Sequence, residues 1–159
     1  MKRTLSVEWE DPVALAEAGR KMPGIDFLRA IRDGRLPAPP IARLLGFDLV
    51  EVEPGHAVFE LVPGEHHYNP IGAVHGGLAM TLLDSAMGCA VQTQMPAGGG
   101  YTTLEAKTNL VRPITSATGR LRAIGKLVHA GKRVATAEGR LEDARGKLYA
   151  HATTTCLIL

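Results

Sequence analysis

Several features are scarce in this chain of 159 residues, and each scarcity excludes a class of protein. The only two cysteines, Cys89 and Cys156, lack metal-ligand spacing, so the sequence indicates neither a disulfide framework nor a cysteine-based zinc site. No apolar run approaches the ~20 residues that cross a bilayer, so we expect no membrane span. A net charge of +2 is too small to indicate a nucleic acid partner.

The amino-terminal residues M-K-R-T-L-S-V-E-W-E lack the apolar stretch of a signal peptide, so we expect a cytoplasmic protein. An apolar fraction of 45% and a charged fraction of 21% are typical of a globular chain with one core. The adjacent histidines His66 and His67 are a poor metal site, because neighbouring side chains rarely converge on one ion. We therefore predict no metal and no cofactor.

We divide the chain into an N-terminal helical arm, residues 1–40, and a second part, residues 41–159. An Asp-Pro entry signal predicts a helix over residues 11–22, and a short amphipathic turn follows at residues 27–32. The segment L-P-A-P-P, residues 36–40, is interpreted as a stiff connector because proline restricts itself and the residue before it.

From Gly46 onward the apolar pattern favours strands on either side of one long apolar helix, residues 75–94. Short breaks that contain glycine or proline separate the strands and suit antiparallel hairpins. The pattern predicts an α+β fold, in which one antiparallel sheet of about six strands wraps around the helix. The expected strands cover residues 47–52, 56–62, 101–112, 119–129, 132–142 and 148–158.

Asp84 stands out because residues 77–91 are apolar on nearly every face of the predicted helix. A helix of that kind is usually buried. Burying an ionised carboxylate without a partner costs several kcal/mol, so such a group is usually paired, protonated or functional. We therefore predict that Asp84 is buried and that it is a candidate catalytic group.

The segment N-P-I-G-A-V-H-G-G precedes Asp84 and leads into the helix. The unpaired N–H groups of Gly76 and Gly77 at the helix start favour an anion, such as the oxyanion of a thioester under attack. A tight turn that needs two glycines is the alternative. Asn69 can hydrogen-bond a carbonyl or orient a water, or it can serve only the turn. For His75, a structural bond to the loop is favoured over a catalytic base, because no serine or cysteine nucleophile is evident.

Gly77 and Asp84 are seven residues apart, which is ~10 Å along a helix axis. A carbonyl held at the glycine amides therefore cannot also touch Asp84 of the same chain. If both groups act on one bond, the carboxylate comes from a second copy. The spacing predicts an obligate twofold dimer with two shared sites.

Several motifs together resemble the PaaI-type (phenylacetic acid degradation-related) thioesterases of the hotdog superfamily, over residues from about 36 to 159. They are N-P-x-G-x-x-H-G-G (69–77), L-D-S-A-x-G (83–88), Y-T-T-L-E (101–105), R-P (112–113), G-K-R-V-A-T-A-E (131–138) and A-H-A-T-T-T (150–155). The resemblance implies a hotdog fold, dimers that often pair into tetramers, and hydrolysis of an acyl-CoA thioester to acid and CoA. CoA is then part of the substrate, and no separate cofactor is implied.

The resemblance also implies residue roles. Asp84 would be the catalytic carboxylate, as a base that activates water or as a nucleophile. Gly88 falls where some relatives carry a threonine, so that hydroxyl is absent here. The remaining implied roles are the oxyanion-hole amide (Gly76), the polar group near the thioester (Asn69), the residue that orders the loop (His75) and a position that helps to hold water (Thr103).

Binding of CoA requires groups that hold phosphate, and the candidates lie in the basic second half of the chain. We assign this role to Arg112, Gly131, Lys132 and Arg133, with a merely solvated surface as the alternative. Two other function classes stay open. One is a non-catalytic hotdog protein that senses or carries an acyl-CoA. The other is a hotdog hydratase, whose base and acid pair the motif fits poorly.

Overall fold

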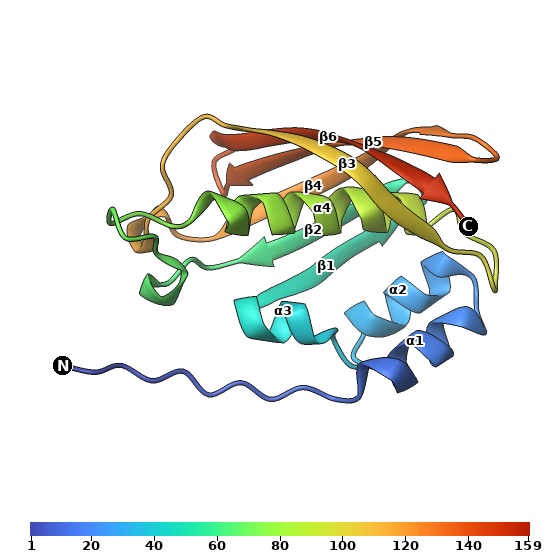
Figure 1. Ribbon diagram of the computed structural model, residues 1–159, viewed down its shortest axis with the longest axis horizontal. Helices are drawn as coiled ribbons and strands as arrows, with labels where there is room; N and C mark the ends of the chain where they lie inside the picture. Colours follow the sequence, from blue (N-terminus) through green and yellow to red (C-terminus); the bar gives the residue numbers. More distant parts are fainter.

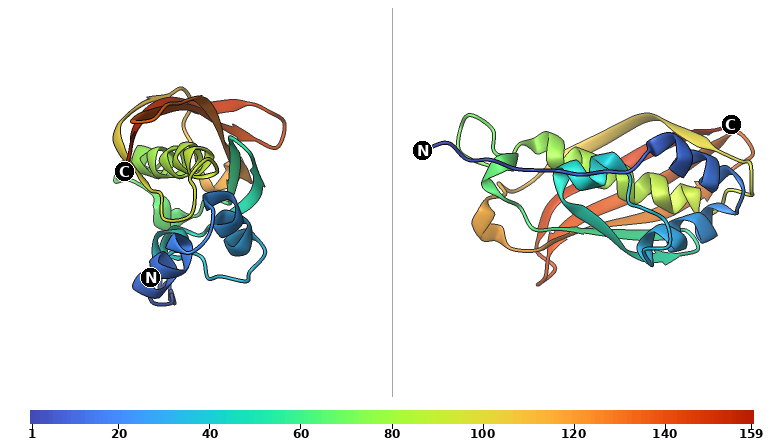
Figure 2. Two further views of the ribbon diagram at one scale, coloured as in Figure 1. Left: turned by 90° about the vertical axis from the view of Figure 1, so that its right-hand side faces the viewer. Right: turned by 90° about the horizontal axis from the view of Figure 1, so that it is seen from below.

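The computed structural model describes residues 1–159 and shows one antiparallel sheet curved around a central helix, α4 (Gly76–Gln92) (Figures 1 and 2). The sheet has six strands in the order β1-β2-β4-β5-β6-β3, and every neighbouring pair is antiparallel. The predicted α+β fold is confirmed. The strands are β1 (Phe47–Glu53), β2 (His56–Leu61), β3 (Tyr101–Leu110), β4 (Leu121–Ala130), β5 (Val134–Asp143) and β6 (Leu148–Ile158).

The helix α4 lies against the concave face of the sheet, and the core forms between the two. Leu83 and Met87 of α4 are fully buried there. Gly125 of β4 and Gly139 of β5 lie where the helix crosses the sheet. A Cβ at Gly125 would collide with the backbone of Ala86, so glycine at this position lets helix and sheet approach closely.

Three helices precede the sheet and pack beside β1 and the C-terminal end of α4 (Figure 1). The first, α1 (Pro12–Arg20), begins at the Asp11 cap and was predicted; for the second, α2 (Gly24–Arg32), only a short turn over residues 27–32 was predicted, and the helix begins three residues earlier. The third, α3 (Pro40–Leu45), was missed because its prolines were interpreted as a connector. Proline suits the first position of a helix, where no N–H partner is needed, and Gly46 ends α3 with a left-handed φ of 71°.

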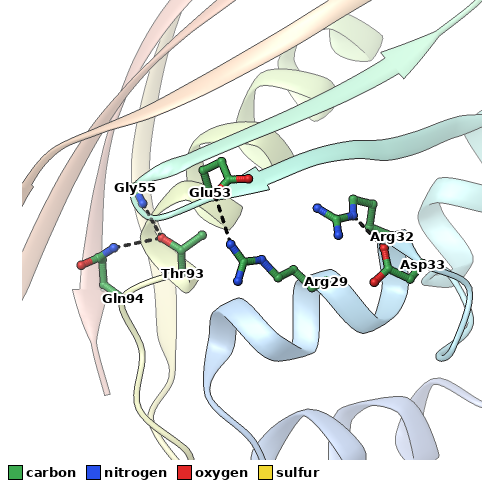
Figure 3. Close-up of polar contacts among 7 residues, drawn as sticks. All are labelled: Arg29, Arg32, Asp33, Glu53, Gly55, Thr93 and Gln94. Atoms are coloured by element: carbon green, nitrogen blue, oxygen red, sulfur yellow. Dashed lines mark hydrogen bonds and ion pairs between the residues drawn. The ribbon is translucent and has the colours of Figure 1, made fainter.

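Hydrogen bonds fix these helices to the rest of the chain. The Gly24 N–H donates to the carbonyl of Met95 at 2.9 Å, and the Gly98 N–H donates to the carbonyl of Arg20 at 2.9 Å. Figure 3 shows a further contact, in which the Arg29 guanidinium lies 3.1 Å from the Glu53 carboxylate at the end of β1. The arm is therefore an integral part of the fold.

Thr93, the residue that ends α4, connects the helix to the turn between β1 and β2 (Figure 3). Its hydroxyl accepts a hydrogen bond from the Gly55 N–H at 2.8 Å and donates one to the carbonyl of Ala90 at 2.7 Å. These two hydrogen bonds fix the position of the C-terminal end of α4 relative to the sheet. None of the helices combines the length and the apolar character needed to cross a membrane.

Candidate active site

Asp84 is exposed in the single chain, so the prediction of a buried carboxylate is wrong here. The sheet covers only part of the circumference of α4, and the uncovered part contains Asp84 and Met80, which is 46% exposed. Thr81 and Ser85 flank this stripe and are half-buried. The monomer therefore does not bear the free-energy cost of burying this charge, and the side of α4 that carries Asp84 is accessible to a partner chain.

Strand β3 holds the Asp84 side chain in place. The hydroxyl of Thr103 donates a hydrogen bond of 2.9 Å to Asp84 Oδ1. Asp84 Oδ2 has no hydrogen bond to the protein, so one carboxylate oxygen is oriented and the other is free to accept a proton or to attack. Thr103 thus contacts the carboxylate directly, whereas the resemblance implied contact with a water.

The N-terminus of α4 carries one engaged amide and one free amide. His75 precedes the helix, and its Nδ1 accepts a hydrogen bond of 2.9 Å from the Gly77 N–H. The Gly76 N–H has no acceptor within the chain. This leaves a single donor, reinforced by the positive end of a 17-residue helix, to meet a developing negative charge.

The loop before the helix closes on Asn69. Asn69 Oδ1 accepts hydrogen bonds from the N–H groups of Ile71 at 3.0 Å and Ala73 at 3.2 Å. The backbone N–H of Asn69 donates to the carbonyl of Ala73 at 2.7 Å. The amide nitrogen of the side chain, Nδ2, has no partner in the chain. Asn69 therefore shapes the loop through its oxygen and keeps a donor for a ligand.

His67 supports the same loop, and sequence reasoning missed this role. Its Nδ1 accepts from the Gly64 N–H at 3.0 Å, its Nε2 hydrogen-bonds the carbonyl of Leu45 at 3.0 Å, and its own carbonyl accepts from the His75 N–H at 2.8 Å. Burial lowers the pKa of His67, so the imidazole is held in its neutral form. No sequence signal pairs a histidine with a carbonyl so distant in the chain.

A pocket of about 320 Å³ opens at the N-terminus of α4. Four predicted site residues line it together: Asn69, His75, Gly76 and Arg112. Arg112 is exposed, and its Nη1 donates a 2.6 Å hydrogen bond to the carbonyl of Leu148. The pocket thus combines free N–H donors with a positive charge at the end of a helix, an arrangement suited to an anionic or carbonyl-bearing ligand.

Other predicted residues lie far from this pocket in the same chain. Asp84 is eight residues after Gly76, or ~12 Å along the helix. Gly131, Lys132 and Arg133 form the turn between β4 and β5, where the Arg133 carbonyl accepts from the Ile158 N–H at 2.9 Å. Ile158 pairs with the first residue of β3, whereas Arg112 follows its last. Arg112 and this turn are therefore separated by the length of a ten-residue strand, roughly 30 Å.

Tyr101 is a second residue that sequence reasoning missed, although its motif was noted. A Cβ added at Gly88 would lie 2.5 Å from the Tyr101 hydroxyl oxygen, so the tyrosine occupies the space that a larger residue at position 88 would need. Burial raises the pKa of Tyr101 well above its usual value, with smaller contributions from Cys89, Cys156 and Asp84. A neutral hydroxyl therefore lies one helical turn beyond the candidate carboxylate.

Comparison with known proteins identifies the family. A sequence model described as the thioesterase superfamily matches residues 71–150, the segment that holds α4 and most of the sheet. The chain belongs to the thioesterase superfamily. Its enzyme class is therefore that of a thioester hydrolase. The chain contains no group of three His, Cys, Asp or Glu side chains arranged to hold a metal ion.

Individual relatives agree with this family. A protein of Saccharolobus solfataricus described as an esterase is 31% identical over 134 residues, which cover 84% of this chain and 94% of the relative. A 1,4-dihydroxy-2-naphthoyl-CoA hydrolase of Listeria monocytogenes is 27% identical over 65% of this chain and 83% of the relative. The structure of a phenylacetic acid degradation-related protein of Ralstonia eutropha JMP134, described as a thioesterase, is 30% identical, with a TM-score of 0.74 over 82% of this chain and 98% of that chain. The resemblance to PaaI-type hotdog thioesterases is confirmed.

Proposed function

We propose that the protein hydrolyses an acyl-CoA thioester to a free acid and CoA, with Asp84 as the reacting carboxylate. The observation that carries this proposal is the hydrogen bond from Thr103, which orients one oxygen of a solvent-facing carboxylate and leaves the other free. The similarity to a naphthoyl-CoA hydrolase supports CoA as the thiol component.

The site is formed by two chains. One carbonyl cannot reach both Gly76 and Asp84 of the same chain, because these groups are ~12 Å apart along α4. The edge strand β3 offers an unpaired backbone to a second copy, and its Leu104 and Leu110 are 57% and 49% exposed. Antiparallel pairing of two β3 strands about a twofold axis would continue the sheet and set each Asp84 opposite Gly76 of the partner subunit.

In this arrangement the thioester carbonyl oxygen accepts a hydrogen bond from the Gly76 N–H. As negative charge develops on that oxygen, the N–H and the helix dipole stabilise it. Asp84 Oδ2 either takes a proton from water, so that hydroxide attacks the carbonyl carbon, or attacks that carbon itself and forms an anhydride that water then cleaves. In both routes the C–S bond breaks, and CoA leaves as a thiolate that is then protonated. Single turnover in ¹⁸O-water detects an anhydride that water cleaves at the Asp84 carbonyl carbon, because that route transfers an unlabelled carboxylate oxygen to the product and leaves ¹⁸O in Asp84.

The same pairing would bring the basic residues of two chains close enough to bind one CoA molecule. Within one chain, Arg112 and the turn formed by Gly131, Lys132 and Arg133 lie at opposite ends of β3. Antiparallel pairing would bring Arg112 of one chain toward this turn of the other. A CoA molecule whose thioester lies at Gly76 would then have guanidinium and ammonium groups available for its phosphates.

The experiment that tests the function is release of free thiol from short, medium, long and aryl acyl-CoA substrates. We expect Asp84→Asn to keep the fold and to lose 10²- to 10⁴-fold in kcat, the range for loss of a general base. Asp48→Asn, at an exposed position on β1, is the matched control and should retain activity. Near-normal turnover by Asp84→Asn would remove Asp84 from the mechanism.

A mixing experiment tests the shared site. Asp84→Asn and Gly76→Pro each damage both sites of a homodimer. A heterodimer carries one site with both defects and one intact site. Random re-association of equal amounts should therefore restore about a quarter of wild-type activity. No recovery after verified subunit exchange would mean that both groups act within one chain.

A further inference from the structure

A second pocket, of about 240 Å³, lies between the N-terminal arm and the body of the protein. Eleven of its thirteen lining residues are hydrophobic, so it is a site for an apolar ligand. Most of the lining comes from the segment before β1, whose role the sequence did not reveal. Leu15, Phe27, Leu28 and Ile31 form the arm side, and Phe59 and Tyr101 lie on the sheet side.

The pocket is built into the fold. Leu15 and Leu28 on its arm side are 8% and 4% exposed, and the bond from the Gly24 N–H to the Met95 carbonyl ties α2 to the end of α4. The Arg29–Glu53 ion pair ties the same helix to β1 (Figure 3). An apolar pocket of this size, held in place by these contacts, is suited to bind an apolar group.

The pocket begins close to the candidate carboxylate. Cys89 and Tyr101 line it, and the Tyr101 hydroxyl lies against Gly88. Gly88 is four residues after Asp84, which is ~6 Å along α4. The charge of Asp84 contributes, after burial and the two cysteines, to the raised pKa of Tyr101, which agrees with this proximity. A group attached to a carbonyl at Asp84 would therefore reach the pocket past Tyr101.

We propose that this arm pocket binds the apolar tail of the acyl group and selects substrates by its size. An apolar cavity of roughly 150 Å³ holds a benzene molecule. The arm pocket is larger, so it accepts a six-membered ring with a short linker, or an alkyl tail of similar volume. Acyl groups of two carbons end before they reach it. The identity of the reaction rests on the proposed function, whereas binding of the tail does not.

The test measures binding without hydrolysis. Thioether analogues of acetyl-, butanoyl-, hexanoyl-, octanoyl- and phenylacetyl-CoA, which cannot be cleaved, are titrated into the full-length protein by calorimetry. Each methylene that enters the pocket should tighten binding about fourfold, until the pocket is full. Comparison of the octanoyl with the phenylacetyl analogue distinguishes an alkyl from an aryl tail.

Two substitutions fill the pocket from the segment before β1, Ala42→Leu on α3 and Ala38→Leu just before this helix. Either variant that keeps the wild-type melting temperature should weaken the octanoyl and phenylacetyl analogues about tenfold and leave the acetyl analogue unchanged. Ala16→Leu, at an exposed position of α1 away from the pocket, is the matched control and should bind like the wild type.

The two proposals fail in different ways. Hydrolysis of acyl-CoA without dependence of affinity on tail size would overturn the arm pocket and leave the thioesterase intact. Affinity that rises with tail size and falls in the filled variants, without hydrolysis of any acyl-CoA, would support the pocket and refute the proposed reaction. Equal weakening of all analogues, acetyl included, would also overturn the pocket, because selection by size requires a difference between them.

Discussion

Replacing Gly76 with proline removes one atom group, the N–H at the start of α4, with little change to the backbone. Gly76 is the first helical residue, the position where proline is favoured. The preceding residue, His75, has φ of −61° and ψ of 132°, an extended conformation that a following proline accepts. The variant therefore separates the role of the N–H from that of the helix.

The size of the effect follows from the hydrogen bonds at this helix start. Loss of one oxyanion donor costs about 3–4 kcal/mol of transition-state stabilisation, or 10²- to 10³-fold in kcat. Gly77 cannot compensate, because its N–H already donates to His75 Nδ1 at 2.9 Å. We therefore expect Gly76→Pro to lose at least 10²-fold in kcat, with a smaller change in KM.

Gly76→Ala is the matched control because it keeps the N–H. Both variants add a Cβ that would lie 2.5 Å from Leu110 Cδ1, the flexible end of a side chain. Both should therefore show the same small loss in melting temperature. Steady-state thiol release then compares the two. If alanine and proline at position 76 lower kcat equally, the Gly76 N–H does not stabilise the transition state, and the proposed oxyanion site is wrong.

Three further predictions follow from the contacts around the site. Thr103→Val, which removes the hydrogen bond to Asp84, should lower kcat about tenfold, whereas the exposed Thr102→Val should not. Arg112→Gln should raise KM for acyl-CoA about tenfold in thiol-release assays, and it should leave the corresponding acyl-pantetheine, which lacks the nucleotide phosphates, unaffected. Burial lowers the pKa of His67 below its usual 6.5, so the unfolded chain binds its proton more readily. The free energy of unfolding should therefore have its highest contribution from His67 above pH 6.5, and this contribution should be lost as the pH falls toward the lowered pKa. Urea titrations at several pH values should show a smaller loss of stability at low pH for His67→Gln than for the wild type.

The strands were predictable because their information is local. Strands β4, β5 and β6 have side chains that alternate between core and solvent over much of their length, and the segments that follow β1 to β5 contain glycine or proline. The long helix was predictable from its unbroken apolar run, and it begins and ends within two residues of the expected positions. The helix α3 was missed because proline is compatible with both a connector and a first helical turn, and only the residues after Pro40 distinguish them.

The parts that could not be predicted depend on residues far apart in the chain. His67 supports the active-site loop through the carbonyl of Leu45, 22 residues earlier. The arm pocket requires side chains from four helices and three strands to meet. A sequence pattern shows that Leu28 is on an apolar face. It does not show that this face leaves a space in front of Tyr101.

The mistaken burial of Asp84 has a physical cause that bears on the dimer. The apolar pattern of a helix indicates which side chains are buried in the functional protein. It does not distinguish burial within one chain from burial against a second chain. Almost every face of α4 is apolar, yet the single chain leaves Met80 and Asp84 uncovered beside the open edge of β3. The stripe where the sequence and the single chain disagree is therefore the stripe that the proposed twofold pairing would cover. The same pairing would place the Asp84 carboxylate, which is exposed in one chain, in drier surroundings, where its charge acts more strongly on a bound thioester.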